Sequence, residues 1–412
     1  MKIALVTQYF WPESFSINDL VQTLVEQGHT IEVFTGKPNY PEGEVFSGYS
    51  ADGCMQETFI SGVTVHRVPL RPRKSGGAKN LLLNYLSFVF NGLRYFPGSA
   101  KGKDFDVVFV FTLSPITSVI PAIYLKWKLK KPLVIWVLDL WPESLQATGF
   151  IKNRLILRAV GWMVRAIYAS TDAILVQSQA FVSAVSRYSN REKIIYYANS
   201  YKEVPPTITD STQIPVDLLS ELENKFCVVF AGNLGTAQAV ETLVDAAERL
   251  RHMADFRLVL VGSGSMSGWL QQQKEERALD NLILAGRFPA QEMPQFFARA
   301  QALLVSLKRA EIFAQTVPAK VQSYLAAGKP IIAALDGEGA RVVREAKAGL
   351  TCPAEDVEGL VDCIKQLYKM PLADREAMGV AGRTYFLENF EMGKQATRLA
   401  QILENCVTRS KG

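Results

Sequence analysis

A lysine close behind a proline is the residue of this chain with the clearest potential for chemistry. Pro318 can occupy the first turn of a helix that Gly328 ends, and Lys320 then lies in that first turn. The first turn of a helix leaves backbone N–H groups unpaired, so a lysine beside them forms a site for an anion, most commonly phosphate. The alternative is an ordinary surface helix with a solvated lysine.

Two glycine loops follow the predicted strands 227–231 and 257–261 in the same half of the chain. Such loops bring bare backbone N–H groups to helix N-termini, an arrangement that suits a diphosphate. Neither loop matches the dinucleotide or the Walker fingerprint, and a plain turn explains each one equally well. Loops at consecutive strand ends are a stronger signal together than singly. The residues concerned are Gly232, Asn233, Gly235, Gly262 and Gly264.

Cations and an aromatic ring follow two further predicted strands. Arg287 and Phe288 could meet a base, although core packing explains Phe288 at least as well. Lys308 and Arg309 come after the next strand, and with Lys320 they place two or three cations beside the expected phosphates. These cations could neutralise a leaving group without a metal.

Carboxylates are expected at strand ends in both halves of the chain. Asp336 and Glu338 flank Gly337, where a carboxylate can hold sugar hydroxyls; a solvated turn is the alternative. In the first half, Asp139 and Glu143 are candidates for acceptor binding or proton removal. Glu143 could equally be a residue of the first turn of a helix, where the helix dipole favours it.

Other polar residues of the first half give weaker signals. Ser14 and Ser16 follow the first predicted strand and could touch phosphate or an acceptor. Asp104 and Asp106 form a D-x-D pattern, which binds a metal diphosphate in some transferases. Because they precede a buried strand, we interpret this pattern as structural and predict no metal site. The five cysteines contain no C-x-x-C pair, which argues against zinc and for a reducing compartment.

Strands and helices alternate along the whole chain, which predicts the α/β class with helices on both faces of parallel sheets. The 412 residues are too many for one core, and the proline-rich stretch 201–222 indicates a linker. We therefore expect two Rossmann-like domains, residues 1–200 and 223–385, facing each other across a ligand-binding cleft. The segment 373–410 is predicted to be helical. The predicted strands are 2–7, 30–35, 63–68, 107–111, 133–138, 173–177, 194–197, 227–231, 257–261, 282–285, 302–305 and 331–334.

Basic charge is concentrated in the first half. The net charge is +5, and residues 67–131 contain 12 lysines and arginines against two acidic residues. The apolar segment 81–93 lies among these cations, a combination that suggests contact with an anionic membrane surface. A core helix between solvated basic loops is the alternative, and nucleic acid is a weaker option because no binding motif accompanies the charge. No signal peptide or convincing transmembrane segment is expected.

Four segments together are specific for one family. The segments 27–29, 139–144, 231–235 and 317–330 resemble those of the retaining family 4 glycosyltransferases of the GT-B fold. The resemblance covers nearly the whole chain and is strongest to the subgroup that builds bacterial surface polysaccharides such as colanic acid and O-antigen. It implies a nucleotide sugar bound mainly by the C-terminal domain and an acceptor bound by the N-terminal one. It also implies a final helix, about 386–412, that crosses back onto the first domain.

The chain departs from the family pattern at several expected contacts. Many members carry two glutamates eight positions apart, and these places hold Gln315 and Ser323 here. Glu311 matches the text around the first glutamate but comes four residues too early. A basic pair usual in the glycine loop is replaced by Asn233 and Gln238. A histidine often seen in the first domain is replaced by the segment 112–115. We expect Lys308, Arg309 and Lys320 to supply the missing charge.

The resemblance implies a metal-independent, retaining glycosyltransferase without a cofactor beyond its sugar donor. A UDP-linked donor, carrying an N-acetylated hexosamine or deoxyhexosamine, would glycosylate a polyprenyl-diphosphate-linked glycan at the cytoplasmic membrane face. Lys320 would stabilise the leaving diphosphate, Asp139 would sit near the acceptor hydroxyl and Glu338 near the donor sugar. The first rival is a UDP-sugar 2-epimerase, against which the scarcity of histidine speaks. The second is a non-catalytic scaffold of a polysaccharide assembly complex.

Overall fold

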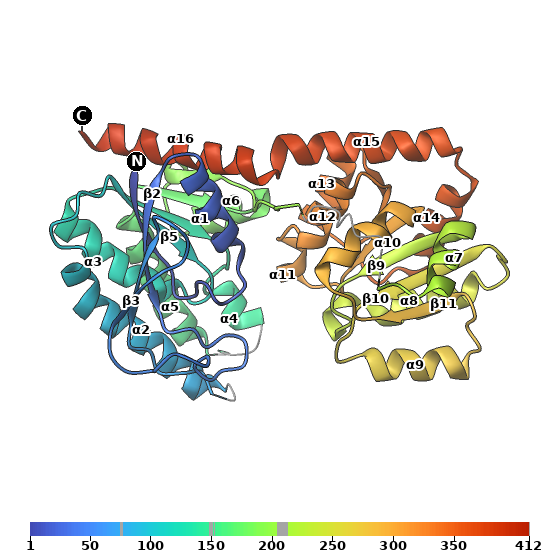
Figure 1. The fold of residues 1–412 in the computed structure, drawn as a ribbon, viewed down its shortest axis with the longest axis horizontal. Helices are drawn as coiled ribbons and strands as arrows, with labels where there is room; N and C mark the ends of the chain where they lie inside the picture. Colours follow the sequence, from blue (N-terminus) through green and yellow to red (C-terminus); the bar gives the residue numbers. More distant parts are fainter. Residues whose placement is uncertain (75–76, 148–150, 152, 204–212, 412) are drawn as a thin grey trace. The chain divides into compact units, whose positions relative to one another are not determined.

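The structure, a computed structural model, describes residues 1–74, 77–147, 151, 153–203 and 213–411 (Figure 1). The chain divides into two compact units. Unit 1 comprises Met1–Ser200 with Met392–Gly412, and unit 2 comprises Tyr201–Glu391. Each unit contains one sheet with helices on both faces, as the alternation of strands and helices predicts.

Unit 1 contains an eight-stranded sheet in the order β3-β4-β2-β1-β5-β6-β7-β8, parallel except for the pair β3 and β4. Its strands are β1 Lys2–Val6, β2 Thr30–Gly36, β3 Met55–Thr58, β4 Thr64–Val68, β5 Val107–Thr112, β6 Leu133–Val137, β7 Ala173–Val176 and β8 Ile194–Tyr196. Its α-helices are α1 Ser16–Glu26, α2 Ala78–Ser99, α3 Ile120–Leu129, α4 Glu143–Ala147, α5 Arg154–Ala169, α6 Gln179–Ser186 and α16 Met392–Lys411. The central strands β5 and β6 are buried throughout, as expected of a sheet covered on both faces.

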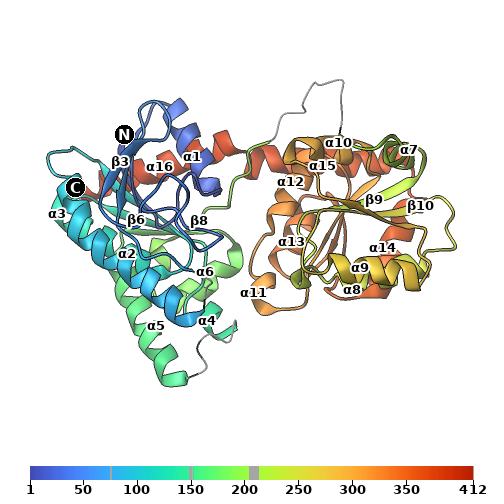
Figure 2. The same ribbon diagram turned by 60° about the horizontal axis from the view of Figure 1, so that its bottom comes forward.

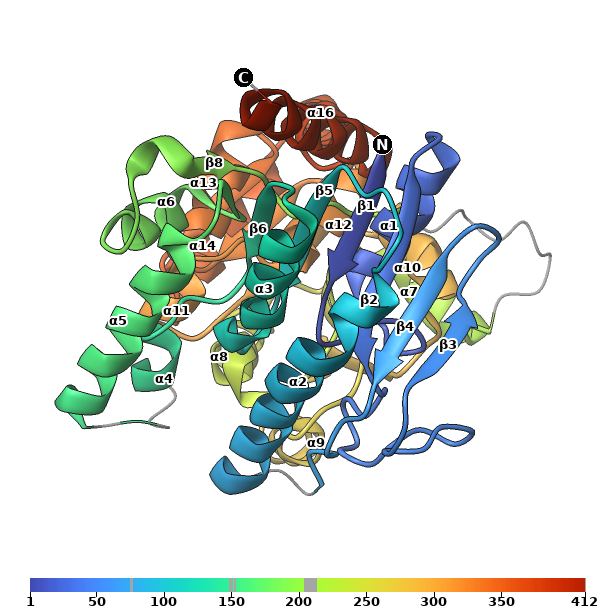
Figure 3. The same cartoon turned by 90° about the vertical axis from the view of Figure 1, so that its left-hand side faces the viewer.

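The two faces of this sheet have separate cores. Helices α2, α3, α5 and α6 bury apolar residues such as Phe88, Leu125 and Val164 against one face. Helices α1 and α16 pack on the other face, with Leu20 and Leu399 in that core (Figure 3). The last helix of the chain thus belongs to the same unit as the first strand.

Unit 2 contains a six-stranded, wholly parallel sheet in the order β11-β10-β9-β12-β13-β14. Its strands are β9 Phe226–Ala231, β10 Phe256–Val261, β11 Leu282–Gly286, β12 Ala302–Ser306, β13 Ile331–Ala334 and β14 Gly349–Cys352. Its α-helices are α7 Val216–Asn224, α8 Val240–Arg249, α9 Ser267–Glu276, α10 Met293–Arg299, α11 Glu311–Ala314, α12 Ala319–Ala327, α13 Glu338–Glu345, α14 Val357–Lys369 and α15 Leu372–Asn389. Helices α10, α12 and α15 lie on one side of the sheet, and α8 and α14 on the other (Figure 2).

Three expectations need correction, and one is refined. The stretch 201–222 is not only a linker, because α7 begins at Val216 within it. The segment 373–410 is helical, as predicted, and consists of two helices that end and begin around Phe390 and Glu391. Two further strands, β3 and β14, escaped prediction. Pro318 occupies the N-cap position of α12, one residue before the helix begins.

Candidate functional sites

Lys320 lies in the first turn of α12, where the sequence placed it. Its ammonium contacts Oε1 of Gln238 and lies 4.0 Å from the centre of the Phe230 ring. Among the described residues, no carboxylate forms an ion pair with it. Burial lowers the pKa of Lys320 to about 8. A half-buried ammonium whose contacts among the described residues are a neutral oxygen and a ring is suited to receive an anion.

The glycines after β9 and β10 are required by close backbone contacts. Gly232 and Gly262 both have φ of +139°, which L side chains rarely adopt. A Cβ on Gly262 would lie 1.9 Å from the carbonyl oxygen of Gly232. A Cβ on Gly232 would lie 2.6 Å from Cε of Lys320. The two loops and the lysine side chain therefore meet at the carboxyl ends of β9 and β10.

The other residues of these loops lie close together at the same strand ends. A Cβ on Gly264 would lie 2.6 Å from Oδ1 of Asn233, and one on Gly235 would lie 2.8 Å from its Nδ2. The Asn233 side chain thus fills the space between the two glycines. The structure brings together all five residues that the sequence assigned to these loops.

A cavity of about 580 Å³ opens beside Lys320 in unit 2. Its lining includes Gly232, Met293, Phe297 and Ser323, so it is mainly apolar with a few polar groups. This size and composition are typical of sites for small molecules. The hydroxyl of Ser323 donates to the carbonyl of Lys320 at 3.0 Å.

Lys308 and Arg309, the other two cations expected beside the phosphates, have carboxylate partners. Nζ of Lys308 lies 3.1 Å from Oε1 of Glu241. Nε of Arg309 lies 3.6 Å from Oδ2 of Asp336, and its backbone N–H donates to Glu355. Their positive charge is thus partly neutralised within the protein, unlike that of Lys320.

The remaining candidates of unit 2 are held by neighbours. Nη2 of Arg341 donates to Glu338, the buried first residue of α13, at 2.8 Å. Gln315 donates to Glu311 at 3.2 Å, and both lie at α11. A Cβ on Gly337 would lie 1.9 Å from the carbonyl oxygen of Ala314, so α11 abuts the start of α13. The roles in donor binding that we predict for Glu338, Glu311 and Gln315 stay predictions.

The base contact expected after β11 has a competing explanation. Phe288 packs edge to face against the buried Phe296, with ring centres 5.1 Å apart. Arg287, next to it, is exposed. The core-packing interpretation therefore accounts for this aromatic ring.

Asp139 is the centre of a polar cluster after β6 in unit 1. Its Oδ2 accepts from Nε1 of Trp141 and from Oγ of Ser144, each at 3.2 Å. Glu143 is the first residue of α4, as the second interpretation of the sequence had it, and lies 3.7 Å from Nη1 of Arg187. Ser14 and Ser16 are both exposed in the loop before α1 and at its start.

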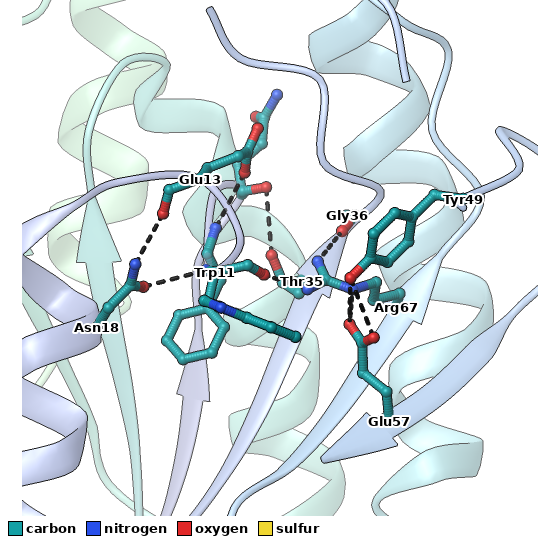
Figure 4. A network of polar contacts seen from close by, with 10 residues as sticks. Trp11, Glu13, Asn18, Thr35, Gly36, Tyr49, Glu57 and Arg67 are labelled. Carbon is teal, nitrogen blue, oxygen red and sulfur yellow. Dashed lines mark hydrogen bonds and ion pairs between the residues drawn. The ribbon is translucent and has the colours of Figure 1, made fainter. Parts of the chain in front are cut away.

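A buried glutamate that the sequence analysis missed joins two loops of unit 1 (Figure 4). Glu13 is 2% exposed, and its Oε1 accepts from the backbone N–H groups of Asn39 at 2.9 Å and Tyr40 at 2.8 Å. Its Oε2 accepts from the N–H of Phe10 at 3.1 Å. Burial raises the pKa of Glu13 to about 7, against these hydrogen bonds, which lower it. An acidic residue inside an aromatic segment was the signal available in the sequence.

An arginine network supports the same loops (Figure 4). Arg67 is 1% exposed and donates to the carbonyl of Gly36 at 2.9 Å, to Trp11 and to Glu57. It thereby ties the loop after β1 and the end of β2 to β3. Arg67 is far in sequence from Trp11 and Gly36, so this network cannot be recognised from the sequence.

Two doubly wound units in succession, with a candidate anion site at the strand ends of the second, are the arrangement of the GT-B fold, which is found in glycosyltransferases that use nucleotide sugars. Two family models match the chain: "Glycosyl transferase 4-like domain" over residues 15–199 and "Glycosyl transferases group 1" over residues 225–370. The chain belongs to family 4 of these enzymes. The predictions of fold, family and enzyme class are confirmed.

Known relatives and structures agree with this assignment. The chain is 25% identical over 409 residues to the putative colanic acid biosynthesis glycosyl transferase WcaI of Escherichia coli K12, covering 94% of this chain and 97% of that protein. It is 24% identical to a GDP-mannose-dependent phosphatidylinositol monomannoside mannosyltransferase of Mycolicibacterium smegmatis, over 59% of this chain and 67% of that one.

Solved structures with low sequence identity share the fold. Sucrose-phosphate synthase of Thermosynechococcus elongatus is 15% identical, with a TM-score of 0.72 and 99% of both chains covered. Anabaena HepE in complex with UDP is 14% identical, with a TM-score of 0.69, covering 98% of this chain and all of that one. At these identities the likeness concerns the fold alone.

Proposed function

We propose that the protein transfers a sugar from a UDP-linked donor to a polyprenyl-diphosphate-linked glycan in the assembly of a bacterial surface polysaccharide. The donor part of this proposal rests on the ammonium of Lys320, which forms no ion pair among the described residues and lies beside the glycine loops and the cavity of unit 2. WcaI supports the polysaccharide role by its name. Anabaena HepE, which shares the fold, binds UDP in its solved structure, and UDP is the nucleotide that we propose. An N-acetylated hexosamine or deoxyhexosamine is the sugar that we favour.

Under this proposal, Lys320 supplies the positive charge that the basic pair of the glycine loop supplies in other family members. Gln238 stands near one place of that pair, and the Lys320 ammonium contacts the Gln238 side chain. A cation is therefore present at this place, but α12 supplies it instead of the glycine loop. Lys308 and Arg309 contribute less positive charge to the donor site, because Glu241 and Asp336 partly neutralise them.

In the proposed reaction the bond from the anomeric carbon to the phosphate oxygen breaks and the acceptor hydroxyl forms the new glycosidic bond, with retention. The hydroxyl proton passes to the departing phosphate or to Asp139, whose second oxygen, Oδ1, has no hydrogen bond to Trp141 or Ser144. Lys320 and the backbone N–H groups of the loops stabilise the diphosphate, so the proposal needs no metal. Glu338, held by Arg341, would contact the donor sugar.

A thermal-shift panel of UDP-, GDP-, dTDP- and CMP-sugars without added metal tests the donor. A ligand at about 100 times its Kd adds roughly 2.7 kcal/mol to the free energy of unfolding. We expect a clear shift with one UDP-sugar. A shift with GDP-mannose instead would align the donor with that of the mannosyltransferase relatives. Conversion of a UDP-sugar without any acceptor would establish the epimerase, and no shift at all would favour the scaffold.

The outer surface of one helix layer of unit 1 suits a membrane. Helices α2, α3 and α5 lie on the same face of the sheet and contain no aspartate or glutamate (Figure 3). Their cations are Lys79, Arg94, Lys126, Lys128, Arg154, Arg158 and Arg165. Leu82, Leu86 and Phe90 recur every four residues along α2, and each is more than half exposed. Lys126 forms an ion pair with Asp172 at 2.8 Å, whereas the other six cations form none among the described residues. Apolar side chains among such cations fit the surface of an anionic bilayer.

We accordingly place the protein at the inner face of the cell membrane. Among the described residues, no helix is long and apolar enough to cross a bilayer. Sedimentation with phosphatidylglycerol vesicles tests peripheral binding. We expect binding that weakens at high salt and falls markedly in the double variant Leu86→Gln, Phe90→Gln. The control is Val380→Gln, an equally exposed apolar residue on α15 of unit 2. Equal sedimentation of both variants would refute the assigned surface.

A further inference from the structure

A guanidinium without a carboxylate partner lies in an aromatic cluster of unit 1. The carbon between the Arg73 nitrogens is 5.1 Å from the ring centre of Tyr40 and 5.8 Å from that of Tyr9. Phe15 completes the cluster, with its ring centre 5.3 Å from that of Tyr40 and 5.6 Å from that of Tyr9. Among the described residues, no aspartate or glutamate forms an ion pair with Arg73. Its charge is therefore held in place by ring faces but not neutralised.

Buried amides fix the backbone on both sides of this cluster. Asn39, which is fully buried, accepts from the Arg73 backbone N–H at 3.3 Å and from Nδ2 of Asn84 at 3.4 Å. Nε2 of Gln8 donates to Asn84 at 2.8 Å, and the buried Oε1 of Gln8 has no partner among the described residues. Glu13 joins the loops that carry Tyr9 and Tyr40. A buried polar network of this kind holds its members in one arrangement.

The cluster belongs to the same region of unit 1 as Asp139. Tyr85, on α2, forms a hydrogen bond with Ser114, whose hydroxyl also accepts from Nε1 of Trp141 at 3.2 Å. Burial raises the pKa of Tyr85, while the charge of Arg73 lowers it and that of Asp139 raises it, so both charges lie near this phenol. Trp141 in turn donates to Asp139. A row of hydrogen-bonded groups thus runs from Asp139 through Trp141 and Ser114 to Tyr85, and the charge of Arg73 acts on the Tyr85 end of this row.

We propose that Arg73, presented by Tyr9 and Tyr40, is the recognition site for the phosphate of the acceptor. The inference rests on the proposed function in one respect, namely that the acceptor is a lipid diphosphate. The planar guanidinium forms two parallel hydrogen bonds with phosphate oxygens, and the tyrosine rings restrict its orientation in advance. Asp139, farther along the row, would then contact the uncharged, hydroxyl-bearing part of the same acceptor.

The test is titration calorimetry of the full-length protein with farnesyl diphosphate, and with farnesol as its uncharged match, in the presence of saturating nucleotide. Saturating nucleotide occupies the anion site of unit 2, so binding there does not obscure the result. We expect Arg73→Gln to weaken farnesyl diphosphate binding by about tenfold or more, since it removes a charged hydrogen-bond partner. Farnesol binding is expected to stay the same, and Arg73→Lys should retain part of the preference for the diphosphate.

Arg71→Gln is the matched control, because Arg71 is an exposed arginine two residues away on the same segment. An equal loss in both variants, or no loss in Arg73→Gln at an unchanged melting temperature, would overturn the site. A melting temperature well below that of the wild type would shift the test to Tyr40→Leu, expected to lower diphosphate affinity and not farnesol affinity. The nucleotide thermal shift of Arg73→Gln should equal that of the wild type. A wild type that binds farnesyl diphosphate through Arg73 but binds no nucleotide would refute the donor proposal and leave this site standing.

Discussion

Replacement of Lys320 by methionine is expected to remove most of the nucleotide-induced thermal shift. Lys320 is the only cation among the described residues that line the cavity of unit 2. A hydrogen bond to a charged group contributes about 1.5–3 kcal/mol, so the nucleotide affinity should fall by roughly ten- to a hundredfold. Titration calorimetry with the nucleotide that the panel selects measures this loss. Normal affinity and turnover in the variant would refute the role of Lys320.

The same substitution is expected to stabilise the protein without its ligand. Burial holds the pKa of Lys320 at about 8, below the 10.5 of a free lysine. Between these values the unfolded state binds more protons, so the free energy of unfolding of the wild type rises with pH in this window. Below pH 8 the full burial cost applies, at most about 3 kcal/mol. The methionine variant should be more stable by up to that amount at pH 7, and the difference should vanish above pH 10.5.

Lys329→Met is the control for both effects. Lys329 follows the other end of α12, and burial also lowers its pKa. The control should therefore tend to stabilise the fold while leaving nucleotide affinity unchanged. Wild-type nucleotide affinity should itself decline as the pH rises above about 8, because Lys320 loses its charge there.

Substitution of Gly262 by alanine is expected to be among the most disruptive single-methyl changes in unit 2. The new Cβ would lie 1.9 Å from the carbonyl oxygen of Gly232, and φ at Gly262 is +139°. Backbone strain of this kind costs about 1–3 kcal/mol, and overpacking costs about 1–3 kcal/mol more. Because a backbone oxygen cannot move aside as a flexible side chain can, the glycine loops and the Lys320 site should be lost together.

Hydrogen exchange of the β9 and β10 amides measures this effect on unit 2 by itself. Gly268→Ala is the matched control, since Gly268 is exposed within α9 and a Cβ there meets nothing within 4 Å. Alanine in a helix is favoured over glycine by roughly 0.5–1 kcal/mol, so the control should not weaken protection. Unchanged protection in Gly262→Ala would show that the loops can separate without cost.

The alternation of apolar and polar segments was enough to predict the α/β fold and most strands within a residue or two. The placement of Lys320 and of the glycine loops could also be predicted, because it depends on local sequence: a helix start and a strand end. The short edge strands β3 and β14 could not, since only one neighbour holds each of them and their burial is weak.

Contacts between distant segments explain the other differences. Glu13 accepts hydrogen bonds from Asn39 and Tyr40, and Arg73 lies over the ring of Tyr9. Because these partners are far apart in the sequence, no local pattern reveals them. The sequence identifies Lys308 and Arg309 as cations but not that Glu241 and Asp336 would reach them. Phe288 is a similar case, because its partner Phe296 belongs to the following helix.

Helix α2 serves both proposed surfaces of unit 1 at once. Asn84 and Tyr85 point from it toward the network around Arg73, while Leu82, Leu86 and Phe90 are exposed along its outer side. Under the two proposals, helix α2 lies between the lipid headgroups and the phosphate of the acceptor. The enzyme would then meet its acceptor by diffusion in two dimensions. Its rate would follow the mole fraction of the acceptor in the bilayer, and diluting the vesicles with bulk solution would leave that rate unchanged.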